Sequence, residues 1–155
     1  MNRDFVEMLA ALSEARADFL VIGAHAVAVY GTPRATGDLD LWVRRTPENA
    51  ERVWAALEAF GAPLHDLTRE DLVSDDVVFQ IGLAPDRIDI LTGVGGVEFE
   101  EAWQRRTEVT LWGQLVPIIG RSDLILTKRA AGRPRDLADI ADLEAKEKTG
   151  GSEPA

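Results

Sequence analysis

Apolar residues in the first half of the chain follow helical and strand spacings in turn. Phe5, Met8, Leu9 and Leu12 recur every three or four positions, which predicts a helix over residues 3–16. The apolar run that follows is short and continuous and ends at a glycine, as is typical of a buried strand. The same reasoning predicts, in order, strand 19–22, short helix 24–30, alternating strand 38–43 and a helix that begins at Thr46.

The second half of the chain has the pattern of hairpins followed by helices. Two hairpins are expected, one from strands 77–81 and 87–91 and one from strands 108–112 and 114–118. The expected helices are 99–105, 122–131 with Ser122 as its cap, and 134–146. This order predicts an α+β fold, a mixed β-sheet flanked by helices, in a single domain over residues 1–146. Residues 147–155 are expected to form a flexible tail.

The composition is that of an ordinary globular domain. Of the 155 residues, 46% are apolar and 28% are charged, and none is a cysteine, which excludes a disulfide scaffold and a thiolate zinc site. No apolar run approaches the roughly 20 residues that a membrane-spanning helix needs. Charged residues interrupt the first 20 positions, where a secretory signal requires an apolar segment. A cytoplasmic domain without membrane contact is therefore expected.

The net charge is uneven along the chain. The 27 acidic and 17 basic residues give a formal charge of −10, which disfavours non-specific binding to nucleic acid. Residues 121–155, however, carry seven acids and seven bases, and most of the bases come first. RNA is therefore a candidate partner only through residues 121–135.

Three aspartates are the residues most indicative of chemistry. Asp38 and Asp40 are two positions apart on an expected strand and so share one face, and Asp89 has the same orientation on another strand. Neighbouring carboxylates repel each other unless a cation lies between them, and oxygen ligands suit Mg²⁺ or Mn²⁺. The alternative is that Asp38 and Asp40 are merely the solvent-facing side of an amphipathic strand.

Gly23 and Ala24 lie where the first strand passes into a short helix. Free backbone N–H groups at such a helix start can hold an anion such as a nucleotide phosphate. An ordinary strand-to-helix turn is the alternative. Arg34, four residues before Asp38, is close enough to bind a phosphate or to pair with a site carboxylate.

Two segments together carry a family resemblance. Residues 20–27 (LVIGAHAV) and 32–41 (TPRATGDLDL) resemble the core of the polymerase-β-type nucleotidyltransferase superfamily. The similarity is greatest to its small bacterial members, which include the minimal nucleotidyltransferases and the abortive-infection (AbiEii-like) toxin type. It covers about residues 5–91, the expected core, and extends loosely through the C-terminal hairpin and helices, 99–146.

The resemblance implies a role for each matching residue. Asp38 and Asp40 would bind two Mg²⁺ ions, for which Mn²⁺ can substitute, while Asp89 would hold the catalytic ion and deprotonate the attacking hydroxyl. Gly23 and the backbone at Ala24 would hold the outer phosphates. The superfamily usually has glycine or serine at the second of these positions, so this chain lacks a hydroxyl contact there.

The C-terminal helices add two candidate nucleotide-binding residues. Lys128 and Arg133 would clamp the triphosphate of ATP or another NTP if these helices fold back over the sheet. Alternatively, they form an exposed basic face paired with Asp136 and Asp139.

The function expected from the resemblance is Mg²⁺-dependent transfer of a nucleoside monophosphate from an NTP to a hydroxyl. The acceptor would be a protein, a tRNA or a small molecule. The toxin-like resemblance favours a protein or tRNA among these and points to a toxin–antitoxin component. Because little chain remains beyond the core, a partner protein, a dimer mate or the C-terminal helices would recognise the acceptor. Two alternatives stay open: a non-catalytic binding or antitoxin module with the same fold, and a metal phosphohydrolase that uses the same carboxylates.

Overall fold

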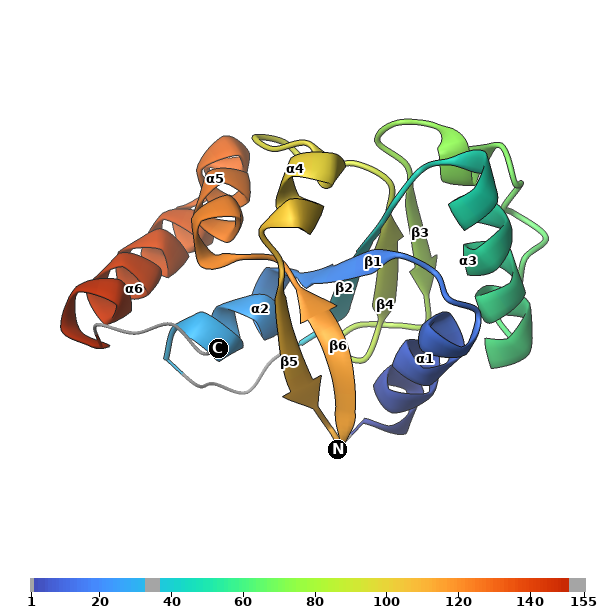
Figure 1. Cartoon of the computed structure of the whole chain (residues 1–155), viewed down its shortest axis with the longest axis horizontal. Helices are drawn as coiled ribbons and strands as arrows, with labels where there is room; N and C mark the ends of the chain where they lie inside the picture. The colour runs from blue at the N-terminus through green and yellow to red at the C-terminus, as the bar shows by residue number, and fades with distance from the viewer. Residues whose placement is uncertain (1, 33–36, 151–155) are drawn as a thin grey trace.

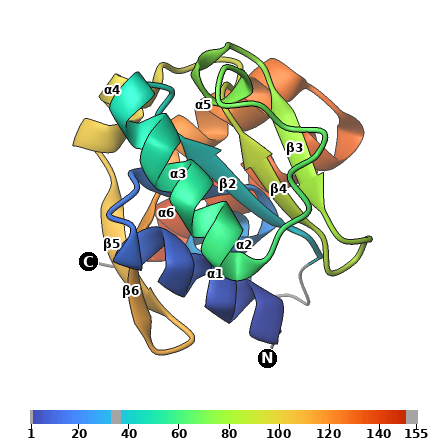
Figure 2. The same cartoon turned by 90° about the vertical axis from the view of Figure 1, so that its right-hand side faces the viewer.

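The computed structural model describes residues 2–32 and 37–150. Its centre is a six-stranded mixed sheet with the order β3-β4-β2-β1-β6-β5. Helices α1 and α3 cover one face of the sheet, and α2, α5 and α6 cover the other (Figure 1, Figure 2). The predicted α+β fold with a mixed, helix-flanked sheet is therefore confirmed.

The elements of the first half match the predicted ones closely. They are α1 (Arg3–Glu14), β1 (Phe19–Ile22), α2 (Gly23–Tyr30), β2 (Leu39–Val43) and α3 (Pro47–Phe60). The N-cap of α1 is Asn2, whose side chain accepts a hydrogen bond from the backbone N–H of Phe5, and Thr46 caps α3 in the same way. Strand β2 begins one residue later than expected, so Asp38 immediately precedes it.

The second half contains both predicted hairpins and all three predicted helices. The elements are η1 (Asp71–Val73), β3 (Val78–Ile81), β4 (Ile88–Leu91), α4 (Phe99–Gln104), β5 (Thr107–Leu111), β6 (Gln114–Ile118), α5 (Arg121–Ala131) and α6 (Pro134–Gly150). The prediction that Ser122 caps α5 was wrong, because the helix already starts at Arg121 with Gly120 as its N-cap.

The predicted tail is also shorter than expected at its start. Helix α6 continues to Gly150, so residues 147–150 are helical. Alanine, lysine and glutamate over residues 145–148 favour helix continuation, and glycine disfavours it. The remainder of the expected tail, 151–155, lies outside the described residues.

The sheet brings distant segments to its centre. Strand β2 pairs with β1 in antiparallel orientation and with β4 in parallel orientation, so Asp40 is opposite Ile22 on one side and Asp89 on the other. Buried Leu39, Leu41 and Val43 alternate with Asp40 and lie on the opposite face of β2. None of the helices in the described ranges is long and apolar enough to cross a membrane.

Candidate active site

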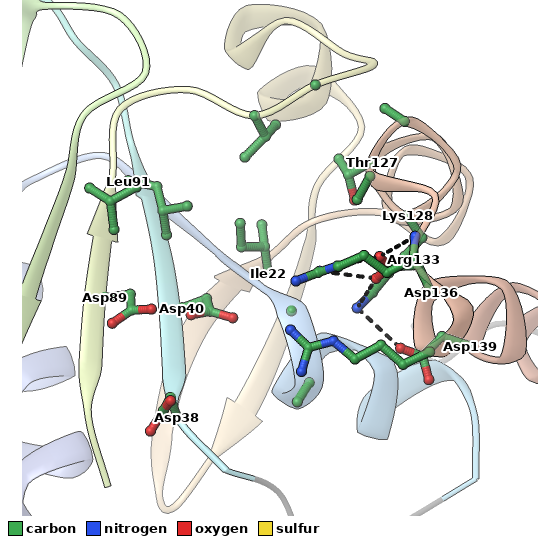
Figure 3. Close-up of a pocket in the computed structure, with 18 of the residues that line it drawn as sticks. Ile22, Asp38, Asp40, Asp89, Leu91, Thr127, Lys128, Arg133, Asp136 and Asp139 are labelled. Carbon is green, nitrogen blue, oxygen red and sulfur yellow. Dashed lines mark hydrogen bonds and ion pairs between the residues drawn. The ribbon is translucent and has the colours of Figure 1, made fainter. Parts of the chain in front are cut away.

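The three predicted aspartates come together on one face of the sheet. Asp40 and Asp89 are direct register partners on the parallel strands β2 and β4, and Asp38 lies just before β2 (Figure 3). The Oδ1 atom of Asp38 accepts a 2.9 Å hydrogen bond from the backbone N–H of Arg87, which ties the start of one strand to the start of the other. The predicted convergence of Asp38, Asp40 and Asp89 is thus present in the structure.

Asp40 has the most perturbed environment of the three. Burial, together with repulsion from the neighbouring carboxylates of Asp89 and Asp38, raises its pKa to about 7. The ammonium group of Lys128 acts on this pKa in the opposite direction. In the absence of another cation, Asp40 is therefore half-protonated near neutral pH.

Gly23 allows the start of α2 to approach this carboxylate closely. Its φ is +70°, and a Cβ atom added there would lie 2.2 Å from Oδ2 of Asp40. No other residue type combines that backbone conformation with that lack of a side chain. The N-cap of α2, Ile22, makes no side-chain capping hydrogen bond, so the first N–H groups of the helix are not capped in this way. Together with Ala24, Gly23 lines the same cavity as the aspartates.

Arg87 is a site residue that the sequence analysis missed. Its Nε and Nη2 donate to the two carboxylate oxygens of Asp89, at 2.7 Å and 3.2 Å, and Nη2 is 3.2 Å from Oδ2 of Asp38. Asp89 beside it raises the pKa of the guanidinium above its usual value. The signal was available, because Arg87 is two residues before Asp89 and hence on the same face of an extended chain.

Helices α5 and α6 bring the predicted basic residues to the other side of the cavity. The Nζ atom of Lys128 is 3.4 Å from Oδ1 of Asp136 and 3.1 Å from Oδ2 of Asp139, and Arg133 forms a fork with Asp136 (Figure 3). The Arg133 hydrogen bond lowers the pKa of Asp136, which is fully buried. The expected pairing with Asp136 and Asp139 is present, but around Lys128 it is buried rather than an exposed face.

These groups surround one cavity of about 640 Å³. Asp40 and Asp89 on the strands and Asp38 just before β2 line it from the sheet, the start of α2 lines it from one side, and Lys128 and Arg133 from another. Arg135 also lines it. A second cavity, of about 260 Å³, adjoins the first and shares the loop residues 93–95 with it.

Arg34 and His25 remain to be considered. Arg34 lies outside the described residues, so its expected role stays a prediction. His25 is buried in α2, and its Nε2 is 3.2 Å from the carbonyl oxygen of Gly37, directly before Asp38. Burial lowers the pKa of His25. This contact places His25 beside the chain that leads into the aspartate pair.

The donor set suits a hard divalent cation. It consists of carboxylate oxygens, and a bound cation would relieve the repulsion that contributes to the raised pKa of Asp40. Within residues 2–32 and 37–150, however, no three acidic or histidine side chains already surround a common point suitable for an ion. Arg87 is the cation that contacts two of the three carboxylates.

The raised pKa of Asp40 predicts an unusual pH dependence of stability. The folded state binds this proton more tightly than the unfolded chain, whose aspartates titrate near 3.8, so stability falls as pH rises from about 4 to about 7. We expect the free energy of unfolding to decrease by about 2–4 kcal/mol between pH 5 and pH 8 in urea titrations. Asp40→Asn should remove most of this decrease. An equal decrease in the variant would contradict the assignment.

Comparison with known proteins connects this fold with nucleotide chemistry. No protein-family model and no curated protein matches the sequence. Among solved structures, the chain is similar to the lincosamide antibiotic adenylyltransferase LnuA with lincomycin bound, with a TM-score of 0.62 and 14% identity over 94% of this chain and 98% of that one. It is also similar to ANT(2″)-Ia in complex with adenylyl-2″-tobramycin, with a TM-score of 0.59 and 18% identity over 95% and 87% of the two chains.

A third similar structure is an antigenic nucleotidyltransferase-like protein from Paracoccidioides brasiliensis. Its TM-score is 0.53 and its identity 16%, over 95% of this chain and 76% of that one. At these identities the likeness concerns the fold. The chain has the nucleotidyltransferase fold, and the resemblance expected from the sequence is confirmed at that level. The particular likeness to the abortive-infection toxin type stays a prediction.

Proposed function

We propose that this protein is a metal-dependent nucleotidyltransferase that transfers a nucleoside monophosphate from an NTP to a hydroxyl group. The observation that carries the proposal is the pairing of Asp40 with Asp89 across β2 and β4, with Asp38 beside them and Gly23 facing Asp40. A carboxylate cluster opposite an uncapped helix start is suited to a metal-bound triphosphate. The fold similarity to adenylyltransferases supports the same reaction class.

Several residues that line the cavity have distinct roles in the proposed reaction. The backbone N–H groups at Gly23 and Ala24 hold the outer phosphates of the NTP, and Lys128 and Arg133 balance their charge from the opposite side of the cavity. Asp89 accepts the proton of the acceptor hydroxyl. A bond forms between the acceptor oxygen and the α-phosphorus as the bond from that phosphorus to the β-phosphate oxygen breaks, releasing pyrophosphate.

Asp38, Asp40 and Asp89 would hold the metal, with Mg²⁺ as the expected ion and Mn²⁺ as its substitute. Two ions are expected from the superfamily resemblance. Bound there, such ions would neutralise the triphosphate and stabilise the charge that develops as pyrophosphate leaves. Burial and the nearby carboxylates of Asp89 and Asp38 raise the pKa of Asp40, and a cation bound among the three aspartates would offset the repulsive part of this effect.

The acceptor we propose is a small hydroxylated molecule with positive charge. The second cavity adjoins the first through the loop residues 93–95, and its charged lining residues are Asp75, Asp76, Glu98 and Arg45. Three acids and one base favour a cationic molecule over a polyanion. The similar proteins named for lincosamide antibiotic adenylyl transfer and for an adenylyl-tobramycin complex agree with a small acceptor.

RNA binding through residues 121–135 has weaker support. Arg121 is buried, Lys128 and Arg133 are paired with α6 carboxylates, and Arg129 lies 3.7 Å from Glu144. Because Lys128 and Arg133 line the cavity in which the NTP is proposed to bind, the rest of this run offers few positive charges to an RNA backbone. The toxin–antitoxin role, a protein or tRNA acceptor, a homodimer or partner protein, and the cytoplasmic location stay predictions.

Labelled substrate tests the proposed reaction directly. The protein is incubated with each α-labelled NTP, Mg²⁺ or Mn²⁺, and either a panel of cationic hydroxylated small molecules or a cell extract, and the products are separated into small molecules, protein and RNA. We expect label in a small molecule. Label in RNA or protein would overturn the acceptor class, and label in no fraction under either metal would overturn the enzyme assignment in favour of a binding module.

A serine in place of Ala24 is predicted to strengthen nucleotide binding. Ala24→Ser adds the hydroxyl that superfamily members with serine at this position carry beside the phosphates. One added hydrogen bond of about 0.5–1.5 kcal/mol predicts a roughly 2- to 10-fold lower dissociation constant for Mg²⁺–NTP in calorimetry. Ala28→Ser makes the same change one turn along α2, where the side chain does not line the cavity, and should leave binding unchanged. Equal effects from both changes would contradict the phosphate site at Ala24.

A further inference from the structure

Arg87 makes the most extensive set of contacts with the site carboxylates. Its guanidinium binds both oxygens of Asp89 and one oxygen of Asp38, while its own backbone N–H binds the other oxygen of Asp38. All four carboxylate oxygens of these two aspartates therefore have a contact with this one residue. The side chains of Arg87, Asp38 and Asp89 are 29%, 20% and 12% exposed, so solvent reaches the group only partly.

The same oxygens are the ligands that the proposed metal site needs. A carboxylate that holds a planar guanidinium fork on both oxygens has its best lone pairs already engaged. A divalent ion coordinated by Asp89 would also be a like charge beside the guanidinium, and close like charges repel. Arg87 and the metal ion therefore compete for Asp89 and Asp38.

We propose that Arg87 is a built-in cation that holds the carboxylates together in the metal-free protein and is displaced from Asp89 when the metal binds. This inference rests on the proposed function, because it takes the three aspartates to be metal ligands. Arg87 immediately precedes β4, and its backbone stays anchored through the hydrogen bond from the N–H of Leu39 to its carbonyl oxygen. The side chain can thus leave Asp89 without a change in the strand pairing.

The contact of Arg87 with the carboxylates has two consequences for the protein. In the metal-free state, Arg87 offsets part of the repulsion between aspartates that the fold forces onto adjacent strands. In the metal-bound state, its displacement lowers the net affinity for metal, since the ion must first replace an existing ion pair. Removal of the guanidinium should therefore weaken the metal-free fold and strengthen metal binding.

Metal binding in the absence of nucleotide tests this competition. Mn²⁺ is titrated into the full chain at pH 8 and followed by electron paramagnetic resonance and calorimetry, for the wild type, Arg87→Gln and Arg87→Lys. We expect Arg87→Gln to bind Mn²⁺ roughly 10- to 100-fold more tightly than the wild type, because charged hydrogen bonds no longer need to be broken. Arg87→Lys, which lacks the planar fork, should lie between the two.

Arg69→Gln is the matched control for the loss of one positive charge. Arg69 is exposed and pairs with Glu51, away from the carboxylates, so its replacement should leave Mn²⁺ affinity within about twofold. Equal or weaker Mn²⁺ binding by Arg87→Gln than by the wild type would overturn the inference and leave the proposed function standing. Absence of Mn²⁺ binding in every variant would overturn the metal site and the inference together.

Thermal unfolding and nuclear magnetic resonance test the inference without relying on metal affinity. Thermal unfolding without metal should occur at a lower temperature in Arg87→Gln, and Mn²⁺ should raise its melting temperature more than that of the wild type. In the wild type, the ¹⁵N resonance of the Arg87 Nε–H group should shift when Mg²⁺ is added. A resonance that is unchanged at saturating Mg²⁺ would show that the ion pair with Asp89 persists and would overturn the displacement.

Discussion

Replacement of Asp89 by asparagine is expected to reduce nucleotidyl transfer by roughly 10³-fold or more. The amide cannot accept the proton of the acceptor hydroxyl, and it supplies a weaker ligand to a cation held between β2 and β4. Since asparagine has nearly the same shape as aspartate, and Arg87 keeps its contacts with Asp38, the fold should persist. Initial rates of pyrophosphate release with saturating acceptor measure the effect.

Asp66→Asn is the matched control for this change. The side chain of Asp66 is 87% exposed and lies between α3 and η1, outside both cavities, so its rate should equal that of the wild type. Circular dichroism of both variants verifies that the fold is retained. A folded Asp89→Asn protein with more than about a tenth of the wild-type rate would exclude Asp89 from the reaction.

Gly23→Ala is expected to disrupt the site and the fold together. The residue has φ +70°, which L-residues with a Cβ adopt at a cost of about 1–2 kcal/mol, and the new methyl group would overlap with Oδ2 of Asp40 at 2.2 Å. The backbone cost and the overlap together should lower the free energy of unfolding by about 2–4 kcal/mol. The overlap should also displace the Asp40 carboxylate. NTP binding in calorimetry should become undetectable.

Gly61→Ala separates the cost of the backbone conformation from the cost of the overlap with Asp40. Gly61 ends α3 with φ +90°, but an added Cβ there would meet no atom within 4 Å, so this variant carries only the backbone cost. It should lose about 1–2 kcal/mol in urea unfolding and bind NTP normally. If Gly23→Ala lost no more stability than Gly61→Ala and still bound NTP, the close approach of α2 to Asp40 would have no functional meaning.

The helices and strands of this protein could be predicted from its sequence because the residues that start and end them lie close to their boundaries. Helix α3, for example, starts at a threonine cap and ends at a left-handed glycine, and each signal lies within a few residues of the boundary. Alternation within β2 and β4 also gave the orientation of Asp40 and Asp89. Alternation does not show whether these two strands are neighbours. In the structure they are, because β2 and β4 pair in parallel register.

The site is completed by contacts that sequence patterns do not carry. The parallel pairing of β1 with β6 joins residues almost a hundred positions apart, and α5 and α6 then lie on the face of the sheet that carries Asp40 and Asp89 (Figure 3). Lys128 was recognised as a candidate, yet the burial of its pairs with Asp136 and Asp139 depends on this long-range packing. Arg87 was missed although its spacing to Asp89 is local, because an arginine at the start of a strand has many other possible partners.

Under the proposed function, the fold and the paired carboxylates together explain how an acidic chain would bind an NTP. The negative charges nearest the substrate are those that a metal would neutralise, and Lys128 and Arg133 face them across the cavity. A cation bound there would also offset the repulsion that, after burial, contributes to the raised pKa of Asp40.

The stoichiometry of the products tests the proposed reaction most directly. With an accepted hydroxylated substrate, ATP and Mg²⁺, we expect one pyrophosphate released for each acceptor molecule that gains a nucleoside monophosphate, as measured by mass spectrometry and a pyrophosphate assay in the same sample. Removal of the metal with a chelator should stop both products. Release of inorganic phosphate without any modified acceptor would refute nucleotidyl transfer and identify a phosphohydrolase instead.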